Sequence, residues 1–189
     1  MYLKQGTNGI NVWVSWVDDL IAIGPKEDVS RNTERMKSSI ECDDIGWINE
    51  YVGCKIEINR EEKHLRFTQP VLLQSFKDEF ELPDKTYQTL AESKQVLQHT
   101  DDDEFFDDKY QSEYRSGVGK LLYLMRWSRP EIWNAVRELS KHMGRCNANH
   151  VKAMKRVMKY CVDTPNRGWL LNPTSQWNGR DTNYRFNLC

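Results

Sequence analysis

Hydrophobic residues form short runs near the start of the chain and recur with helical spacing toward its end. Two apolar runs, 10–14 and 20–23, are rich in β-branched residues. This pattern predicts two strands that are largely buried on a sheet and are joined as a hairpin. Val29 and Met36 follow at helical spacing, which predicts a helix over 28–41.

A second hairpin and a second helix are predicted next. The segments 51–58 and 65–68 have strand character and are separated by the charged turn 59–63. Pro70 is well placed in the first turn of a helix, because proline lacks the N–H that would be unsatisfied there. The apolar face of that helix would consist of Leu72, Leu73, Phe76 and Phe80.

The carboxyl-terminal half has the pattern of a helical region. Periodicity fails over 83–108, where the acidic stretch 101–108 indicates a solvated linker. Helical spacing resumes at Val118, breaks at Pro130 and returns after Val151. The whole chain is therefore predicted to be α+β, with antiparallel hairpins first and helices after them.

Composition narrows the class of protein. The 189 residues, 39% of them hydrophobic, can bury a real core. The five cysteines are widely spaced and include no C-x-x-C pair, so reduced thiols in an intracellular protein, cytoplasmic or nuclear, are expected. We expect neither secretion nor a membrane span, because no signal-peptide pattern and no sufficiently long apolar run occur.

Charge is distributed unevenly along the chain. Residues 109–160 contain twelve Lys and Arg against three Asp and Glu, whereas residues 1–108 contain twelve against twenty-three. A basic helical half is typical of a surface that contacts a phosphate backbone. A solvated helix face is the alternative.

His142, Cys146 and His150 recur every four residues, a spacing that could align metal ligands on one helix. We favour a break in the helix instead, with Asn149 capping the next one, because the usual spacings of zinc ligands are absent.

The first hairpin carries the most specific chemistry. Its tip reads Trp16-Val17-Asp18-Asp19, and two adjacent carboxylates on strand supports can hold divalent cations. A plain polar turn is the alternative reading, since Asp is a common turn former. The turn chemistry is poor, however, because Leu20 follows where Gly would be favoured.

The segment 14–24 resembles the Tyr-x-Asp-Asp hairpin of reverse transcriptases, in the form found in copia-type retrotransposons. Later blocks are similar to that family in the same order, at 50–58, 68–76, 114–124, 128–132 and 150–168.

The resemblance implies a template-directed DNA polymerase that uses two Mg²⁺ ions. Asp18 and Asp19 would be catalytic metal ligands, and Trp16, Val17 and Lys55 would position the primer. The implied partners are an RNA template, a DNA primer, deoxynucleotides and the rest of a Pol polyprotein. The implied nucleic-acid contacts are Lys120, Arg126, Arg129, Lys152, Lys155, Arg156 and Lys159.

The resemblance also implies an order of segments. Residues 1–69 would be the end of a palm, 70–82 a helix entering the thumb, 83–108 a linker, 109–170 a thumb-like helical region and 171–189 a tail approaching RNase H. In the family a further aspartate and the fingers precede the hairpin, so we expect the 189 residues alone to be inactive. The alternative is a non-catalytic nucleic-acid-binding module that uses the basic half.

Overall fold

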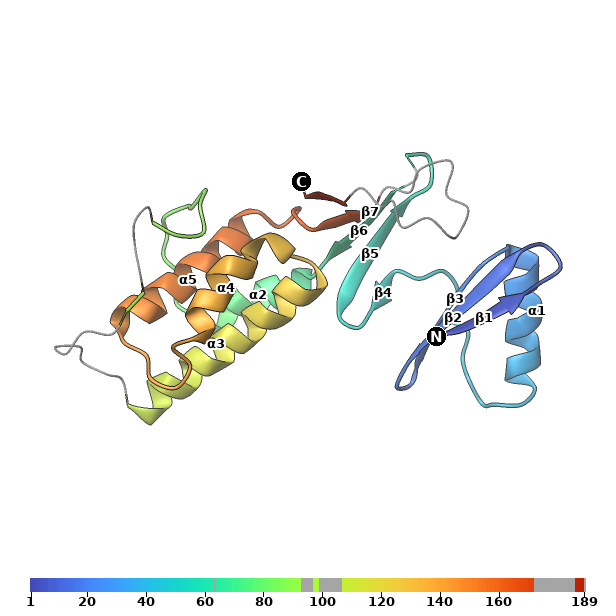
Figure 1. Cartoon of the computed structure of the whole chain (residues 1–189), viewed down its shortest axis with the longest axis horizontal. Helices are drawn as coiled ribbons and strands as arrows, with labels where there is room; N and C mark the ends of the chain where they lie inside the picture. Colours follow the sequence, from blue (N-terminus) through green and yellow to red (C-terminus); the bar gives the residue numbers. More distant parts are fainter. Residues whose placement is uncertain (63, 93–96, 99–106, 172–185, 189) are drawn as a thin grey trace. The chain divides into compact units, whose positions relative to one another are not determined.

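The computed structural model describes residues 1–62, 64–92, 97–98, 107–171 and 186–188 (Figure 1). It divides the chain into two compact units, Met1–Tyr51 and Val52–Cys189. The described residues form α-helices and two antiparallel sheets, so the predicted α+β class is confirmed.

The first unit is a three-stranded sheet with one helix. Strands β1, β2 and β3 are adjacent in that order, and the predicted first hairpin is β2–β3. β1 was not predicted, because it is a four-residue edge strand whose side chains are all exposed. The elements of this sheet and its helix are β1 (Tyr2–Gln5), β2 (Ile10–Trp16), β3 (Asp19–Ile23) and α1 (Lys26–Lys37); β4 (Glu50–Tyr51), which follows, is the first strand of the other sheet.

Polar contacts attach α1 to the loop that joins β1 and β2. The buried carboxylate of Asp28 accepts hydrogen bonds from the backbone N–H of Asn8 at 2.7 Å and from Arg31 at 2.9 Å. Lys4 donates to Asn32 at 2.7 Å. The helix ends at Lys37, short of the predicted residue 41, and Ile40 beyond it is exposed.

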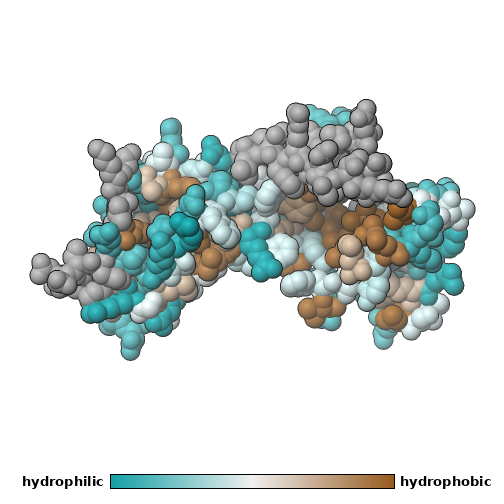
Figure 2. Space-filling view, in the orientation of Figure 1, coloured by the Kyte–Doolittle hydropathy of each residue, from teal (hydrophilic) through white to brown (hydrophobic). Residues whose placement is uncertain are grey.

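The prediction that the strands of this hairpin are largely buried is wrong. Of the β2 residues only Asn11 is fully buried, and no β3 residue is. The cross-strand register places Val12 opposite Ile23, and Ile23 is 57% exposed. A three-stranded sheet with a single helix can cover only one of its faces, so hydrophobic residues remain at the surface of this unit (Figure 2).

The second unit contains a sheet in which strands distant in sequence pair. The predicted second hairpin, β5 (Cys54–Asn59) and β6 (His64–Thr68), is confirmed. β7 (Trp169–Leu171) was not predicted and pairs antiparallel with β6, while β8 (Phe186–Leu188) pairs with β7. Three residues are too few for a strand pattern to be visible in sequence.

Helices supply the core of the second unit. Their buried apolar residues form one cluster, to which α2, α3, α4 and α5 all contribute. The helices are α2 (Pro70–Glu79), α3 (Asp108–Trp127), the 3-10 turn η1 (Pro130–Ile132), α4 (Trp133–Ser140) and α5 (Ala148–Asp163). The predicted helix after Pro70 and its buried face are confirmed by Leu73, Phe76 and Phe80.

Two helix starts differ from the sequence prediction. α3 begins at Asp108, ten residues before its apolar pattern, because Asp107 caps it by accepting from the N–H of Tyr110 at 3.1 Å. α5 is capped by Asn147 and not by Asn149. Asn147 and His150 form a reciprocal capping box, with each side chain accepting from the other residue's N–H at 3.1 Å.

Parts of the predicted linker and tail lie outside the described residues. These parts are 93–96, 99–106, 172–185 and 189. The described residues 83–92, 97–98 and 107 of the linker contain no helix or strand, whereas Asp108, its last predicted residue, begins α3. The linker is not simply solvated, since Tyr87, Leu90 and Leu97 pack against the helical core.

Gly168 and Gly119 provide a matched pair of alanine substitutions. A Cβ at Gly168 would lie 2.3 Å from the carbonyl oxygen of Phe67, a backbone atom that β-pairing holds in place. Gly168→Ala should therefore lower the free energy of unfolding by about 1–3 kcal/mol. Gly119→Ala, in the middle of α3 with nothing within 4 Å, should raise it by about 0.5–1 kcal/mol. Urea unfolding measures both, and equal effects would contradict the pairing of β6 with β7.

Candidate catalytic hairpin and basic helical surface

The tip of the first hairpin is a two-residue turn. Trp16 and Asp19 are the last paired residues of β2 and β3, so Val17 and Asp18 form the turn between them. Val17 has a φ of 52°, a left-handed conformation that is rare for a β-branched residue. Tight hairpin turns require positive φ at the first central position, which explains why this conformation occurs here.

This turn places both carboxylates at the exposed end of the hairpin. Asp18 lies in the turn and Asp19 begins β3, and both side chains are exposed. Val17 is 85% exposed and Trp16 is 50% exposed beside them. The backbone therefore holds two hard oxygen ligands next to an aromatic ring, in a conformation that the sequence does not favour locally.

The carboxylates of this tip are the right kind of ligand for Mg²⁺, which prefers oxygen donors in octahedral geometry. Their number is small. In the described part of the chain no group of three or more His, Cys, Asp or Glu side chains is arranged to hold a metal ion. Asp18 and Asp19 can thus supply part of a coordination shell, and the remaining oxygens would come from water, substrate phosphates or other polypeptide.

Lys55, predicted to lie near the primer, belongs to the second unit. It is exposed on β5, and its ammonium group forms an ion pair with Glu57 at 2.8 Å, on the same face of the strand. This hydrogen bond lowers the pKa of the Glu57 carboxyl. The primer-positioning role of Lys55 stays a prediction.

Arg129 is buried, and this position is inconsistent with its predicted contact to nucleic acid. Its side chain is 1% exposed. The guanidinium donates to Glu131 at 2.5 Å and to the carbonyl and hydroxyl oxygens of Thr164 at 2.9 and 2.8 Å. It also lies over the ring of Tyr160. Arg129 therefore stabilises the fold, because its donors face the protein interior.

Three more of the predicted basic contacts bind within the protein. Arg156 lies 4.3 Å from the ring centre of Tyr87, and it donates to Thr89 and Glu92. Lys120 forms an ion pair with Glu79, and Lys159 pairs with Asp163 at 2.7 Å. The net charge of this half overstates its free cationic surface, since these pairs neutralise part of it.

Arg126, Lys152 and Lys155 remain as cations without an ion pair among the described residues. Arg126 and Lys152 are exposed, and Lys155 is half-buried. These three are the surviving candidates for phosphate contacts in the helical half.

Sequence reasoning missed the contact between Tyr123 and the start of the second unit. Val52 and Gly53 both have positive φ, 48° and 67°. The hydroxyl of Tyr123 on α3 donates to the carbonyl oxygen of Val52 at 2.7 Å, and burial raises the pKa of this hydroxyl. The signal available in sequence was Gly53 alone, which indicates a turn but not its partner.

Among the described residues, the cysteines and histidines form no group that could hold a metal ion. His142 and His150 are stacked with ring centres 3.8 Å apart, and both are buried. Burial raises the pKa of the Cys161 thiol to about 12, which keeps this thiol protonated. The helix is interrupted between His142 and His150, as predicted, and His150 belongs to the capping box of α5.

Comparisons with known proteins agree with the resemblance at a coarse level. The chain is 24% identical over 172 residues, 87% of its length, to the retrovirus-related Pol polyprotein from transposon TNT 1-94 of Nicotiana tabacum. Over 60 residues it is 43% and 42% identical to the corresponding polyproteins from transposons RE1 and RE2 of Arabidopsis thaliana.

The chain is similar to a segment of a transposon Pol polyprotein. The matched segments span 13% of the tobacco polyprotein and 4% of each Arabidopsis polyprotein. No family model and no solved structure matches the chain. None of the helices described has the length and apolar character needed to cross a membrane.

The left-handed conformation of Val17 predicts that glycine would be more stable there. Val17→Gly should raise the free energy of unfolding of the first unit by about 1 kcal/mol, because relief of backbone strain exceeds the added entropy of the unfolded chain. Ser15→Gly, at a strand position of β2, should instead be destabilising by about 0.5–1 kcal/mol. Chemical denaturation measures both, and a destabilised Val17→Gly protein would contradict the turn geometry.

The burial of Arg129 predicts a large effect on stability. Arg129→Gln should lower the free energy of unfolding by about 3 kcal/mol or more, because Glu131 loses its partner in a mostly buried position. Arg126→Gln removes the same charge from the surface and should change stability by less than about 0.5 kcal/mol. Thermal unfolding of the two variants compares them, and similar melting temperatures would contradict the internal role.

Proposed function

We propose that this chain is the catalytic-hairpin and thumb segment of a copia-type reverse transcriptase. The observation that carries the proposal is the tip of the first hairpin, where a two-residue turn with a left-handed Val17 presents Asp18 and Asp19 together. Similarity to transposon Pol polyproteins over 87% of the chain supports it. The reaction would be RNA-templated transfer of a deoxynucleotide to a primer 3′ hydroxyl.

In this proposal Asp18 is the principal metal ligand of the chain and Asp19 its neighbour. Bound Mg²⁺ would neutralise developing charge on the transferred phosphate. The hydrogen-bonded hairpin fixes the backbone positions from which both carboxylates extend, before substrate arrives. Trp16, half-exposed beside them, would contact the primer terminus through its ring.

The second unit would contribute binding rather than chemistry. Lys55 would lie along the primer, while Arg126, Lys152 and Lys155 would contact phosphates of the template–primer duplex. A module that binds nucleic acid through the whole basic half is less well supported, because Arg129 and Arg156 are engaged within the fold. The partners would be an RNA template, a DNA primer and deoxynucleotides.

The metal-binding part of the proposal has a matched control in the chain. Asp43 and Asp44 are also adjacent and exposed but lie outside any strand. Mn²⁺ binds the same oxygen ligands as Mg²⁺ and broadens nearby NMR signals. In the presence of primed RNA template, Mn²⁺ should broaden the NMR signals of residues 17–20 at concentrations that leave the signals of residues 43–44 sharp. Asp18→Asn should abolish this difference. Equal broadening at the two pairs would contradict a metal site.

Primer extension tests the reaction itself. We expect the 189 residues alone to incorporate no deoxynucleotide with Mg²⁺, because the described part of the chain gathers no group of three ligands for a metal ion. If incorporation is observed and Asp18→Asn removes it, the expected inactivity is wrong and the polymerase assignment is supported. Incorporation that persists in Asp18→Asn, with Asp43→Asn as control, would contradict the role of the hairpin.

A further inference from the structure

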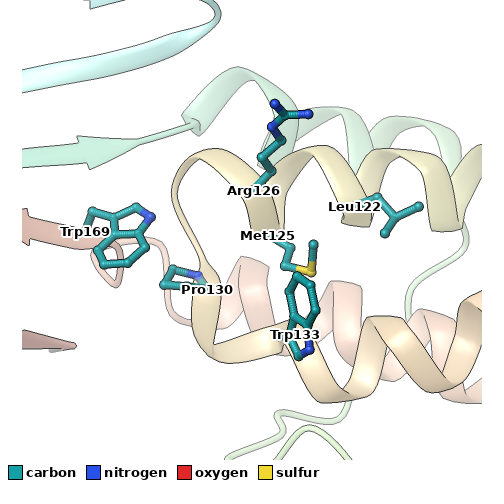
Figure 3. A pocket seen from close by; sticks show the side chains of 6 residues that line it. All are labelled: Leu122, Met125, Arg126, Pro130, Trp133 and Trp169. Atoms are coloured by element: carbon teal, nitrogen blue, oxygen red, sulfur yellow. The ribbon is translucent and has the colours of Figure 1, made fainter. Parts of the chain in front are cut away.

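The second unit contains a cleft whose lining residues, apart from Arg126, have none of the roles assigned above. It has a volume of about 540 Å³, within the range of roughly 300–1,000 Å³ that small-ligand pockets occupy. Figure 3 shows Trp133 against Met125, with Trp169 on the other side of Pro130. The lining residues are Leu122, Met125, Arg126, Pro130, Trp133 and Trp169.

The floor of this aromatic cleft is held in place by the core. Leu122 and Met125 pack against the buried helical cluster. The backbone N–H of Trp169 donates to the carbonyl oxygen of Ser128 at 3.1 Å, which ties β7 to the end of α3. Because its walls come from α3, η1, α4 and β7 and each is anchored, the cleft is preformed.

Trp133 is the unusual member of this lining. This residue is 56% exposed, although most of the apolar residues in these helices are buried. A large exposed aromatic ring in a preformed hollow is typical of a site where a flat partner stacks.

The charge of the cleft selects the kind of partner. Arg126 is the only charged residue of the lining and forms no ion pair among the described residues. The nearby carboxylate of Glu131 is engaged by Arg129. A planar guanidinium that lines the same cleft as the exposed Trp133 fits a ligand that combines a phosphate with a flat ring, since arginine pairs with phosphate in a forked geometry.

We propose that this cleft binds an unpaired base of single-stranded nucleic acid, with the base stacked on Trp133 and its phosphate at Arg126. A base inside a duplex cannot reach the indole, because its faces are covered by neighbouring pairs. The site therefore recognises a single strand such as the template outside the paired region. This inference assigns Arg126, proposed above as a duplex contact, to a single strand instead. It does not require metal binding at Asp18.

Two oligonucleotides separate stacking from charge. The probes are a fluorescein-labelled oligothymidylate of about ten nucleotides and an abasic strand of equal length, which keeps the phosphates and lacks the bases. The 189-residue chain should bind oligothymidylate at least about five-fold more tightly than the abasic strand, because each stacked base contributes about 1–3 kcal/mol. Fluorescence anisotropy at fixed salt measures both affinities.

Variants of the lining assign the difference to this cleft. Trp133→Ala should reduce oligothymidylate binding to the level of the abasic strand, whereas Trp133→Phe should keep most of the preference. Arg126→Gln should weaken both probes and flatten the salt dependence. Trp47→Ala, at an exposed tryptophan of the first unit, and Lys77→Gln, on α2, are the matched controls and should change neither affinity.

Several outcomes would overturn the inference. Equal binding of the two probes by the unaltered chain would exclude base stacking. A preference for oligothymidylate over the abasic strand that survives Trp133→Ala would place the stacking site elsewhere. A short peptide that contains tryptophan and proline should not displace oligothymidylate from the chain. Displacement by this peptide, at a lower concentration than unlabelled oligothymidylate requires, would assign the cleft to a protein partner. Asp18→Asn should leave all these affinities unchanged, so failure of the metal proposal is distinguishable from failure of this one.

Discussion

The guanidinium of Arg129 links the 3-10 turn η1 to the end of α5 in the interior of the second unit. It caps the end of α5 by donating to the carbonyl oxygens of Cys161 and Thr164, and its neighbour Ser128 contacts both β7 and Gln69 at the start of α2. A buried cation is costly unless every donor finds an acceptor. α3 ends at Trp127, and the chain leaves the helix at Ser128, so that at this junction the guanidinium of Arg129 reaches these acceptors.

The aromatic cleft depends on the same junction. Arg126 precedes the buried Ser128 and Arg129 and points to the surface, while Pro130 and Trp133 follow them in η1 and α4. The hydrogen bond from Trp169 to Ser128 brings β7 to the cleft from a distant part of the sequence. The burial of Ser128 and Arg129 thus helps to determine where Arg126 and Trp133, a few residues away in the sequence, meet solvent.

The hairpin of the first unit illustrates a different constraint. Its two-residue turn places Val17 in a conformation that favours glycine, and the turn is retained although its strands are only partly buried. Local strain of this kind is typical of functional positions, where the surrounding hydrogen bonds determine the backbone. The order of hairpin, helix, hairpin and helix was predictable because each element has its own apolar period.

The basic residues mark the limit of prediction from sequence. In the sequence, the basic residues that bind within the fold cannot be distinguished from the other basic residues, because charge type and spacing do not reveal burial. The others are Arg126, Lys152 and Lys155, and the residues bound within the fold are Lys120, Arg129, Arg156 and Lys159. Their partners Glu79, Thr164, Glu92 and Asp163 became visible only in three dimensions. Of these four partners only Asp163 lies within one helical turn.

By itself, the sequence determined the α+β class, the two hairpins, the helix after Pro70 and the carboxylate pair at a hairpin tip, because local periodicity and turn position encode them. The tertiary structure decided which face of the first sheet is covered, that β7 pairs with β6, and that Arg129 is interior while Trp133 is exposed. Those features depend on contacts between residues far apart in the chain, and no local pattern records such contacts.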